Sequence, residues 1–183
     1  IYDGVYTGDL KFTINLVGTD SVPAGSEGSC TVTIADIDHP LSFMLGNYTM
    51  TAEKYKSGPI TWTMTILKDA KDDHMVWFDN LLGNSSWAGE DVRYYGTVNE
   101  DHTVLTIPFG QTSEYKYSNG NPITLLGLTP DLNGYDSGSL NVNIITEGNK
   151  VKLDFGTEWG FWFNIEDAGY ISILLPGITA NKD

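Results

Sequence analysis

Hydrophobic and polar residues alternate with a period of two along most of the chain. This period is typical of β-strands with one buried face, because successive side chains of a strand point to opposite sides. The clearest case is the run in which Ile60, Trp62, Met64 and Ile66 alternate with three threonines. The pattern therefore predicts a protein built largely of strands.

Similar stretches recur along the chain, and together they predict nine or ten strands. The further segments are residues 10–16, 30–34, 75–78, 92–98, 103–107, 140–144, 151–155, 160–165 and 170–175. Residues 99–102, 147–150 and 166–169 are rich in Gly, Asn and Asp, which favour tight hairpin turns. The best candidate for a helix is Leu41–Lys56, although Gly46 within it disfavours a long one.

Strands joined by short hairpins predict an all-β fold and a single domain over residues 1–183. We expect an up-and-down meander that closes as a lipocalin-like barrel of about 8–10 strands, because closure leaves no exposed strand edges. A two-sheet β-sandwich is the alternative, since one-sided alternation suits both architectures.

Composition supports a folded domain and excludes several classes of protein. Of the 183 residues, 40% are hydrophobic and 12% aromatic, which is enough to form a core and argues against global disorder. The formal net charge of −14 disfavours nucleic-acid binding, which needs clustered Lys and Arg. No apolar run approaches the roughly 20 residues of a membrane-spanning helix, so we expect a soluble domain.

The single cysteine and the start of the chain bear on the cellular compartment. Cys30 excludes an intrachain disulfide and a cysteine metal cluster, and its alternating neighbours predict a small buried hydrophobe. The chain begins at Ile1 without an initiator Met, which fits an exported protein whose leader has been removed. We expect a location at the cell surface or outer membrane, or in the periplasm.

Familiar enzyme motifs are absent, so we expect no enzymatic activity and no cofactor. The chain has no nucleophile elbow, no zinc-protease helix motif and no phosphate-binding glycine loop. His39, His74 and His102 each follow an aspartate in an expected turn or strand end. An adjacent carboxylate can orient an imidazole as a metal ligand or acid–base group, but an exposed polar turn explains the pattern as well.

Two acidic segments offer further hypotheses. Asp131, Asn133 and Asp136 provide oxygen atoms for a calcium loop, but the segment departs from the EF-hand pattern, so a plain turn is the simpler interpretation. Glu158 and Glu166 flank an aromatic strand, which gives a third-ranked hypothesis of a hydrolase with paired carboxylates.

Aromatic residues are the candidates for ligand binding. Trp87 stands in a polar loop, Tyr95 follows on the next strand, and Trp159 and Trp162 lie on or beside a strand near the C-terminus. Flat aromatic faces beside Asn and Asp side chains suit sugar rings, so these four residues predict a glycan or small amphipathic ligand. An aromatic core explains the same residues without any ligand.

Part of the chain resembles a known family. The segments Trp62–Ile66, Val76–Leu82, Tyr95–Val98 and Thr106–Gln111 follow one another as in a β-rich domain of uncharacterised exported lipoproteins from gut Bacteroidetes. This resemblance covers residues 61–111. It implies a lipocalin-like or sandwich fold, export, and membrane attachment through a lipid anchor upstream of Ile1, and it supplies no catalytic residues.

Together these features predict a non-catalytic, extracellular or cell-surface β-barrel that binds a glycan or a small amphipathic ligand. The alternative is a structural or adhesive module that contacts another protein and has no pocket. A large cavity inside the barrel would favour ligand binding, whereas a filled interior would favour the structural module.

Overall fold

The computed structural model describes residues 10–15, 18, 28–34 and 39–183. The chain divides into two compact units, residues 1–42 and 43–183, where the sequence predicted one domain. Leu16, the last residue of the first predicted strand, lies outside the described residues.

The first unit contains an antiparallel hairpin of β1 (Leu10–Asn15) and β2 (Ser29–Ile34). Opposed residues in the two strands share a face, and one face is apolar throughout. Its members are Leu10, Phe12, Ile14, Cys30, Val32 and Ile34. Cys30 is exposed, so the prediction that it is buried is wrong: the period of two is present, but among the described residues of this unit no second layer covers the apolar face of the hairpin.

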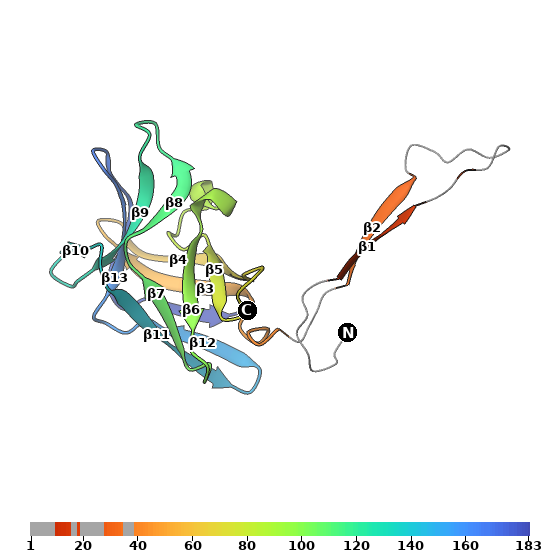
Figure 1. Cartoon of the computed structure of the whole chain (residues 1–183). Helices are drawn as coiled ribbons and strands as arrows, with labels where there is room; N and C mark the ends of the chain where they lie inside the picture. The colour runs from red at the N-terminus through yellow and green to blue at the C-terminus, as the bar shows by residue number, and fades with distance from the viewer. Residues whose placement is uncertain (1–9, 16–17, 19–27, 35–38) are drawn as a thin grey trace. The chain divides into compact units, whose positions relative to one another are not determined.

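The second unit is an eight-stranded antiparallel barrel (Figure 1). Its strands are β3 (Gly46–Lys54), β4 (Gly58–Lys68), β5 (Met75–Asp79), β6 (Tyr94–Val98), β7 (Val104–Pro108), β11 (Ser139–Glu147), β12 (Lys150–Asp154) and β15 (Thr179–Lys182). They follow one another around the ring in chain order, and β15 pairs back with β3. The predicted up-and-down barrel is therefore confirmed, and the sandwich alternative is wrong.

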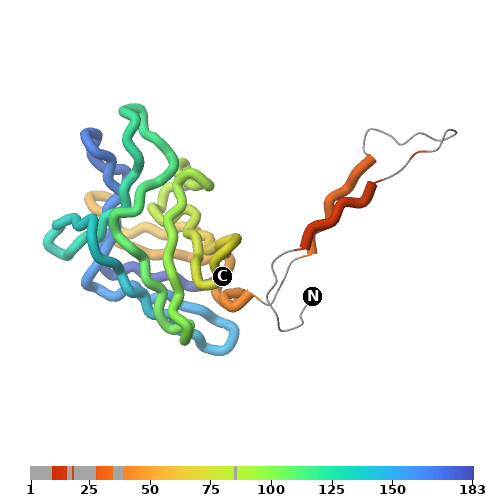
Figure 2. The backbone as a smooth tube through the Cα atoms, viewed as in Figure 1, coloured from red at the N-terminus to blue at the C-terminus, as the bar shows by residue number. Residues whose placement is uncertain are grey.

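Two excursions from the barrel form the additional strands. They contribute β8 (Gln111–Lys116), β9 (Pro122–Leu128), β10 (Gly134–Tyr135), β13 (Gly160–Ile165) and β14 (Gly169–Leu174). Strand β9 pairs with β8, β10 and β13, and β14 links this group back to β3. The turns of the β8–β9 and β13–β14 hairpins lie together at one end of the second unit (Figure 2). There Asn119 and Asn121 donate hydrogen bonds to the Glu166 carbonyl.

The inner face of the barrel is filled by side chains. Residues from seven of its strands have no accessible surface: Tyr48, Met50, Met64, Val76, Phe78, Leu105, Ile107, Val142, Leu153 and Ala180. A side chain beside a water-sized void would keep accessible surface, so these positions form a packed core. This interior resembles that of other small barrels filled by their own side chains, and it is not a ligand cavity at these positions.

Two buried tyrosines tie this core to neighbouring backbone. The Tyr48 hydroxyl donates to the Met44 carbonyl at 2.8 Å, and the Tyr94 hydroxyl donates to the Ile123 carbonyl at 3.2 Å. Burial raises the pKa of both hydroxyls above the usual tyrosine value, so both remain neutral donors. The Tyr94 bond joins the barrel to β9 of the excursion.

The segment Leu41–Lys56, the best candidate for a helix, contains strand β3 instead. Tyr48, Met50 and Ala52 point inward and alternate with exposed polar residues, and β3 pairs with β4 along its whole length. Hydrogen bonding and burial on this scale override weak local preferences. The predicted hairpin turn at residues 147–150 is confirmed, with Gly148 at a φ of 61°.

Candidate functional site

A groove on the outer face of the barrel is built around two aromatic side chains. Val76 and Phe78 of β5 point into the core, so strand alternation places Trp77 on the outside. Tyr95 of β6 lies directly opposite Trp77 in the antiparallel register. Their ring centroids are 5.8 Å apart at an interplanar angle of 64°, which is a favourable edge-to-face contact.

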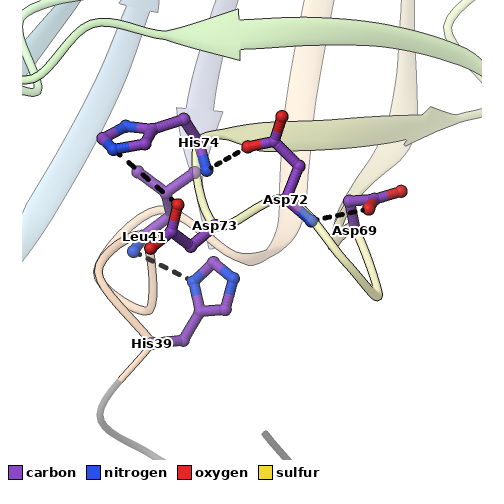
Figure 3. A network of polar contacts seen from close by, with 6 residues as sticks. All are labelled: His39, Leu41, Asp69, Asp72, Asp73 and His74. Carbon is purple, nitrogen blue, oxygen red and sulfur yellow. Dashed lines mark hydrogen bonds and ion pairs between the residues drawn. The ribbon is translucent and has the colours of Figure 1, made fainter. Parts of the chain in front are cut away.

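The Trp77 ring is held in place by Asp69. The Trp77 Nε1–H donates to Asp69 Oδ2 at 2.7 Å, and the other carboxylate oxygen accepts the backbone N–H groups of Lys71 and Asp72 at 2.8 and 3.0 Å. Figure 3 shows the contact of Asp69 with Asp72 in this turn. Burial raises the pKa of the Asp69 carboxyl, but the bonds from Trp77 and the two backbone groups lower it more, and the pKa lies below its usual value.

The groove opens where β6 and β7 separate. These strands pair only through Thr97 with Thr106 and Val98 with Leu105, so the backbone of Tyr95 lies beyond the paired residues. The Gln111 side chain takes the place of the missing strand. Its Oε1 accepts the Tyr95 N–H at 2.8 Å, and its Nε2 donates to the Tyr95 and Pro108 carbonyls at 2.9 and 2.8 Å.

This first groove has a volume of about 700 Å³, within the usual range for ligand sites. Its lining combines aromatic, charged and amide groups: Lys68, Asp69, Ala70, Trp77, Glu90, Arg93, Tyr95, Pro108, Phe109, Gly110, Gln111, Thr112 and Glu114. Three carboxylates and two cationic side chains line it, so the groove has no strong excess of either charge. It can stack a flat ligand and offer it both donors and acceptors.

The loop between β5 and β6 forms one wall of this groove. It contains two short 3-10 helices, η1 (Ser85–Trp87) and η2 (Glu90–Val92). Asp79 fastens it, because Oδ1 accepts the Gly89 N–H at 2.8 Å and Oδ2 lies 3.7 Å from Arg93 Nη2. Trp87 packs its ring against Tyr115 and Tyr117, with centroids 5.0 and 6.0 Å away.

The four predicted ligand residues do not meet at one site. Tyr95 lines the first groove, and Trp87 anchors the loop to β8. Trp162 lies on β13, where a Cβ at Gly134 would stand 2.7 Å from its ring, so the backbone of β10 covers it. Trp159 lines a second groove of about 380 Å³, together with Ser139, Leu140, Asn141, Phe155, Gly156, Thr157 and Glu158.

Sequence reasoning missed Trp77 and Gln111, the residues that most define the first groove. Trp77 lay in a predicted strand, but Met75–Phe78 is apolar at every position, so no alternation marked which side Trp77 faces. The role of Gln111 had no local signal, because its partner Tyr95 is 16 residues away.

Two of the three histidines come together. His74 and His102 have ring centroids 6.4 Å apart, and His74 Nε2 lies 3.8 Å from Asp73 Oδ1. In the first unit, His39 Nδ1 accepts the Leu41 N–H at 3.0 Å (Figure 3). Within the described part of the chain, no group of three or more His, Cys, Asp or Glu side chains is placed to hold a metal ion.

The predicted calcium segment forms a hydrogen-bonded turn. Asp131 Oδ1 accepts from the Thr129 hydroxyl, and Asp131 Oδ2 accepts from the Asn133 amide, both at 2.6 Å. The bond from Thr129 is the main reason that the pKa of Asp131 lies below its usual value. Both oxygen atoms of this carboxylate are thus engaged by protein donors, and Asp136 follows in the link between β10 and β11.

The carboxylates of the hydrolase hypothesis lie at opposite ends of β13. Glu158 precedes this six-residue strand and Glu166 follows it. At about 3.3 Å per residue, the strand alone spans roughly 17 Å from Gly160 to Ile165, and the two glutamates lie beyond its ends, whereas paired catalytic carboxylates lie within about 10 Å of each other. The structure therefore does not bring this pair together.

A scan against protein-family models, together with searches of curated proteins and solved structures, found no match for this chain. The resemblance to exported lipoprotein domains therefore stays a prediction. Among the described residues, no helix has the length and apolar character needed to cross a membrane.

Proposed function

We propose that this protein is a non-catalytic binding module that takes a neutral saccharide in the groove around Trp77 and Tyr95. The single observation that carries the proposal is the fixed pair of aromatic rings on the outer face, surrounded by amide and carboxylate groups. Sugar rings present C–H groups to aromatic faces and hydroxyls to such polar groups. Because Asp69 and Gln111 already hold the aromatic pair, little ordering entropy would be lost on binding.

The electrostatics of the groove favour a neutral ligand. The chain has a formal net charge of −14, which repels polyanions at long range. Within the groove, the lining holds three carboxylates, of Asp69, Glu90 and Glu114, and two cationic side chains. Hydroxyl groups can accept from the cations and donate to the carboxylates, so a neutral sugar can use both, whereas an acidic sugar can use only the cations.

The Asp69 carboxylate also suits binding better than acid catalysis. A glycoside hydrolase needs a carboxyl with a raised pKa to protonate the leaving group. The hydrogen bonds of Asp69 lower its pKa and fix its oxygen atoms on Trp77 and on backbone, so it is a poor proton donor. A carboxylate held in this way supports the non-catalytic role expected from the absence of enzyme motifs.

A structural or adhesive module remains the second candidate, and the filled barrel interior favours it. Such a module would need no saccharide and would use its surface to contact another protein. The extracellular or cell-surface location predicted from the sequence suits both candidates.

Isothermal titration calorimetry tests the proposal with soluble xylan, mannan, mixed-linkage β-glucan and starch. We expect binding to at least one of them, and we expect Trp77→Ala to weaken it by at least about tenfold, as for a central aromatic contact. Tyr170→Ala is the matched control, because Tyr170 is an exposed aromatic on β14 outside both grooves.

Two results would overturn the proposal. The absence of binding to all four polysaccharides would favour the structural module. Unchanged affinity in Trp77→Ala, in a protein whose circular dichroism and melting curve match the wild type, would remove the groove as the binding site.

A further inference from the structure

The two grooves are neighbours on the outer surface of the barrel. Pro108 lines the first groove and Ser139 lines the second, and they are directly opposed in the β7–β11 pair. Opposed residues in an antiparallel pair share a face, and adjacent strands are about 4.8 Å apart. The two grooves therefore adjoin across a single strand pair.

Aromatic side chains continue from one groove into the next. Phe109 lines the first groove, and its ring centroid lies 5.1 Å from that of Trp159, which lines the second. Tyr135 then stands edge-to-face against Trp159 at 5.6 Å and is exposed. Aromatic side chains therefore extend across both grooves, from Trp77 and Tyr95 in the first groove to Trp159 in the second.

Phe109, between the two grooves, is buried and rigidly held. A Cβ at Gly127 would lie 2.3 Å from the Phe109 ring, so the ring rests directly on the backbone of β9. The Phe109 N–H donates to the Gly138 carbonyl at 3.0 Å, and a Cβ at Gly110 would lie 2.3 Å from the Asp136 carbonyl oxygen. Close backbone contacts on both sides thus fix the position of Phe109.

We infer that the two grooves are adjoining subsites for one extended neutral oligosaccharide, which passes from the first groove across the Pro108–Ser139 pair to Trp159. This inference rests on the proposed saccharide-binding function and specifies its ligand as a chain rather than a single sugar. A single compact ligand would need only the first groove, with its 700 Å³ volume. The second groove, with Trp159 and the exposed polar side chains of Ser139 and Asn141, offers a further ring platform with hydrogen-bonding groups beside it.

Chain length is the variable that tests this inference. Calorimetric titrations would use cello-, xylo- and manno-oligosaccharides from disaccharide to hexasaccharide. In the series that binds, we expect affinity to rise by at least about tenfold from the disaccharide to the hexasaccharide as the second subsite fills. Trp159→Ala should abolish this gain, whereas Trp77→Ala should weaken every length.

A second variant keeps the test independent of any loss of packing around Trp159. Ser139→Gln adds a larger neutral side chain at an exposed position of the second groove, and it should likewise remove the gain with length. Tyr170→Ala should leave the whole series unchanged.

The possible failures are distinguishable. Equal affinity for all lengths, or a Trp159→Ala effect of the same size on disaccharide and hexasaccharide, would overturn the inference while the first groove remained a saccharide site. No binding at any length, together with no binding to the polysaccharides, would overturn the proposed function itself.

Discussion

The inner and outer faces of strand β5 use aromatic side chains in different ways. Phe78 points inward and has no accessible surface, and its position is set by close packing. Trp77, the preceding residue, points outward, and its position is set by a directional hydrogen bond to Asp69 and by the Tyr95 ring. In this barrel, adjacent residues therefore serve different purposes: the inner row stabilises the fold, and the outer row is accessible to a ligand.

The largest expected effect comes from truncating the inner aromatic. We expect Phe78→Ala to lower the free energy of unfolding by about 3–5 kcal/mol, because it removes a buried ring and leaves a cavity. Trp77→Ala should cost about 1–2 kcal/mol, because the ring is only partly buried. Urea unfolding followed by circular dichroism measures both. A Trp77→Ala protein less stable than Phe78→Ala would contradict the division between the two faces.

An intermediate effect is expected where the Phe109 ring rests on β9. Gly127→Ala places a Cβ against the Phe109 ring and should lower the free energy of unfolding by about 1–3 kcal/mol, as for other overpacking changes. A double-mutant cycle with Phe109→Ala provides the control. If the ring is the cause, Gly127→Ala should cost much less in the Phe109→Ala background. An equal cost in both backgrounds would show that the strain lies elsewhere.

The inner face was far more predictable from the sequence than the outer one. Alternation identified Met64, Ile66 and Leu153 as buried, because a period of two reports directly which side a residue faces. Strand β15 was missed because it has only four residues, of which Ala180 alone is buried. Strand β3 was missed because its inward residues, Tyr48, Met50 and Ala52, give a weak apolar pattern.

The grooves depend on contacts that no local pattern encodes. The first one exists because β6 and β7 separate and Gln111 bonds to the backbone of Tyr95 in the resulting gap. Trp87 shows that a local pattern can also mislead. A tryptophan in a polar loop predicted a ligand platform, but its ring packs against Tyr115 and attaches the loop to β8. Composition and spacing show that aromatics are present, but long-range pairing decides which of them border a groove.

The smallest expected effect concerns the support of Trp77. The pKa of Asp69 is lowered in the folded protein, so its carboxylate stabilises the fold above the unfolded pKa, near 3.8, and this stabilisation is lost as the pH falls through the folded value. Asp69→Asn should cost about 1 kcal/mol or less at neutral pH, since the site is partly solvated. Urea unfolding at several pH values should show the difference shrinking only below about pH 4. A difference that stayed constant down to about pH 2 would contradict the role of the charge.

The tryptophan indole groups allow the most direct test of the outer-face account. The chain has five tryptophans, and each indole N–H gives its own resonance in a ¹⁵N–¹H spectrum, assigned by single Trp→Phe variants. The protein would be titrated with cellohexaose, xylohexaose and mannohexaose, and one of these sugars should shift the Trp77 signal strongly and the Trp159 signal as well. The Trp62 signal is the internal control and should not shift, because the Trp62 indole is hydrogen-bonded to the Asn80 carbonyl. A titration in which Trp77 stays unchanged while other indole signals shift would contradict the account.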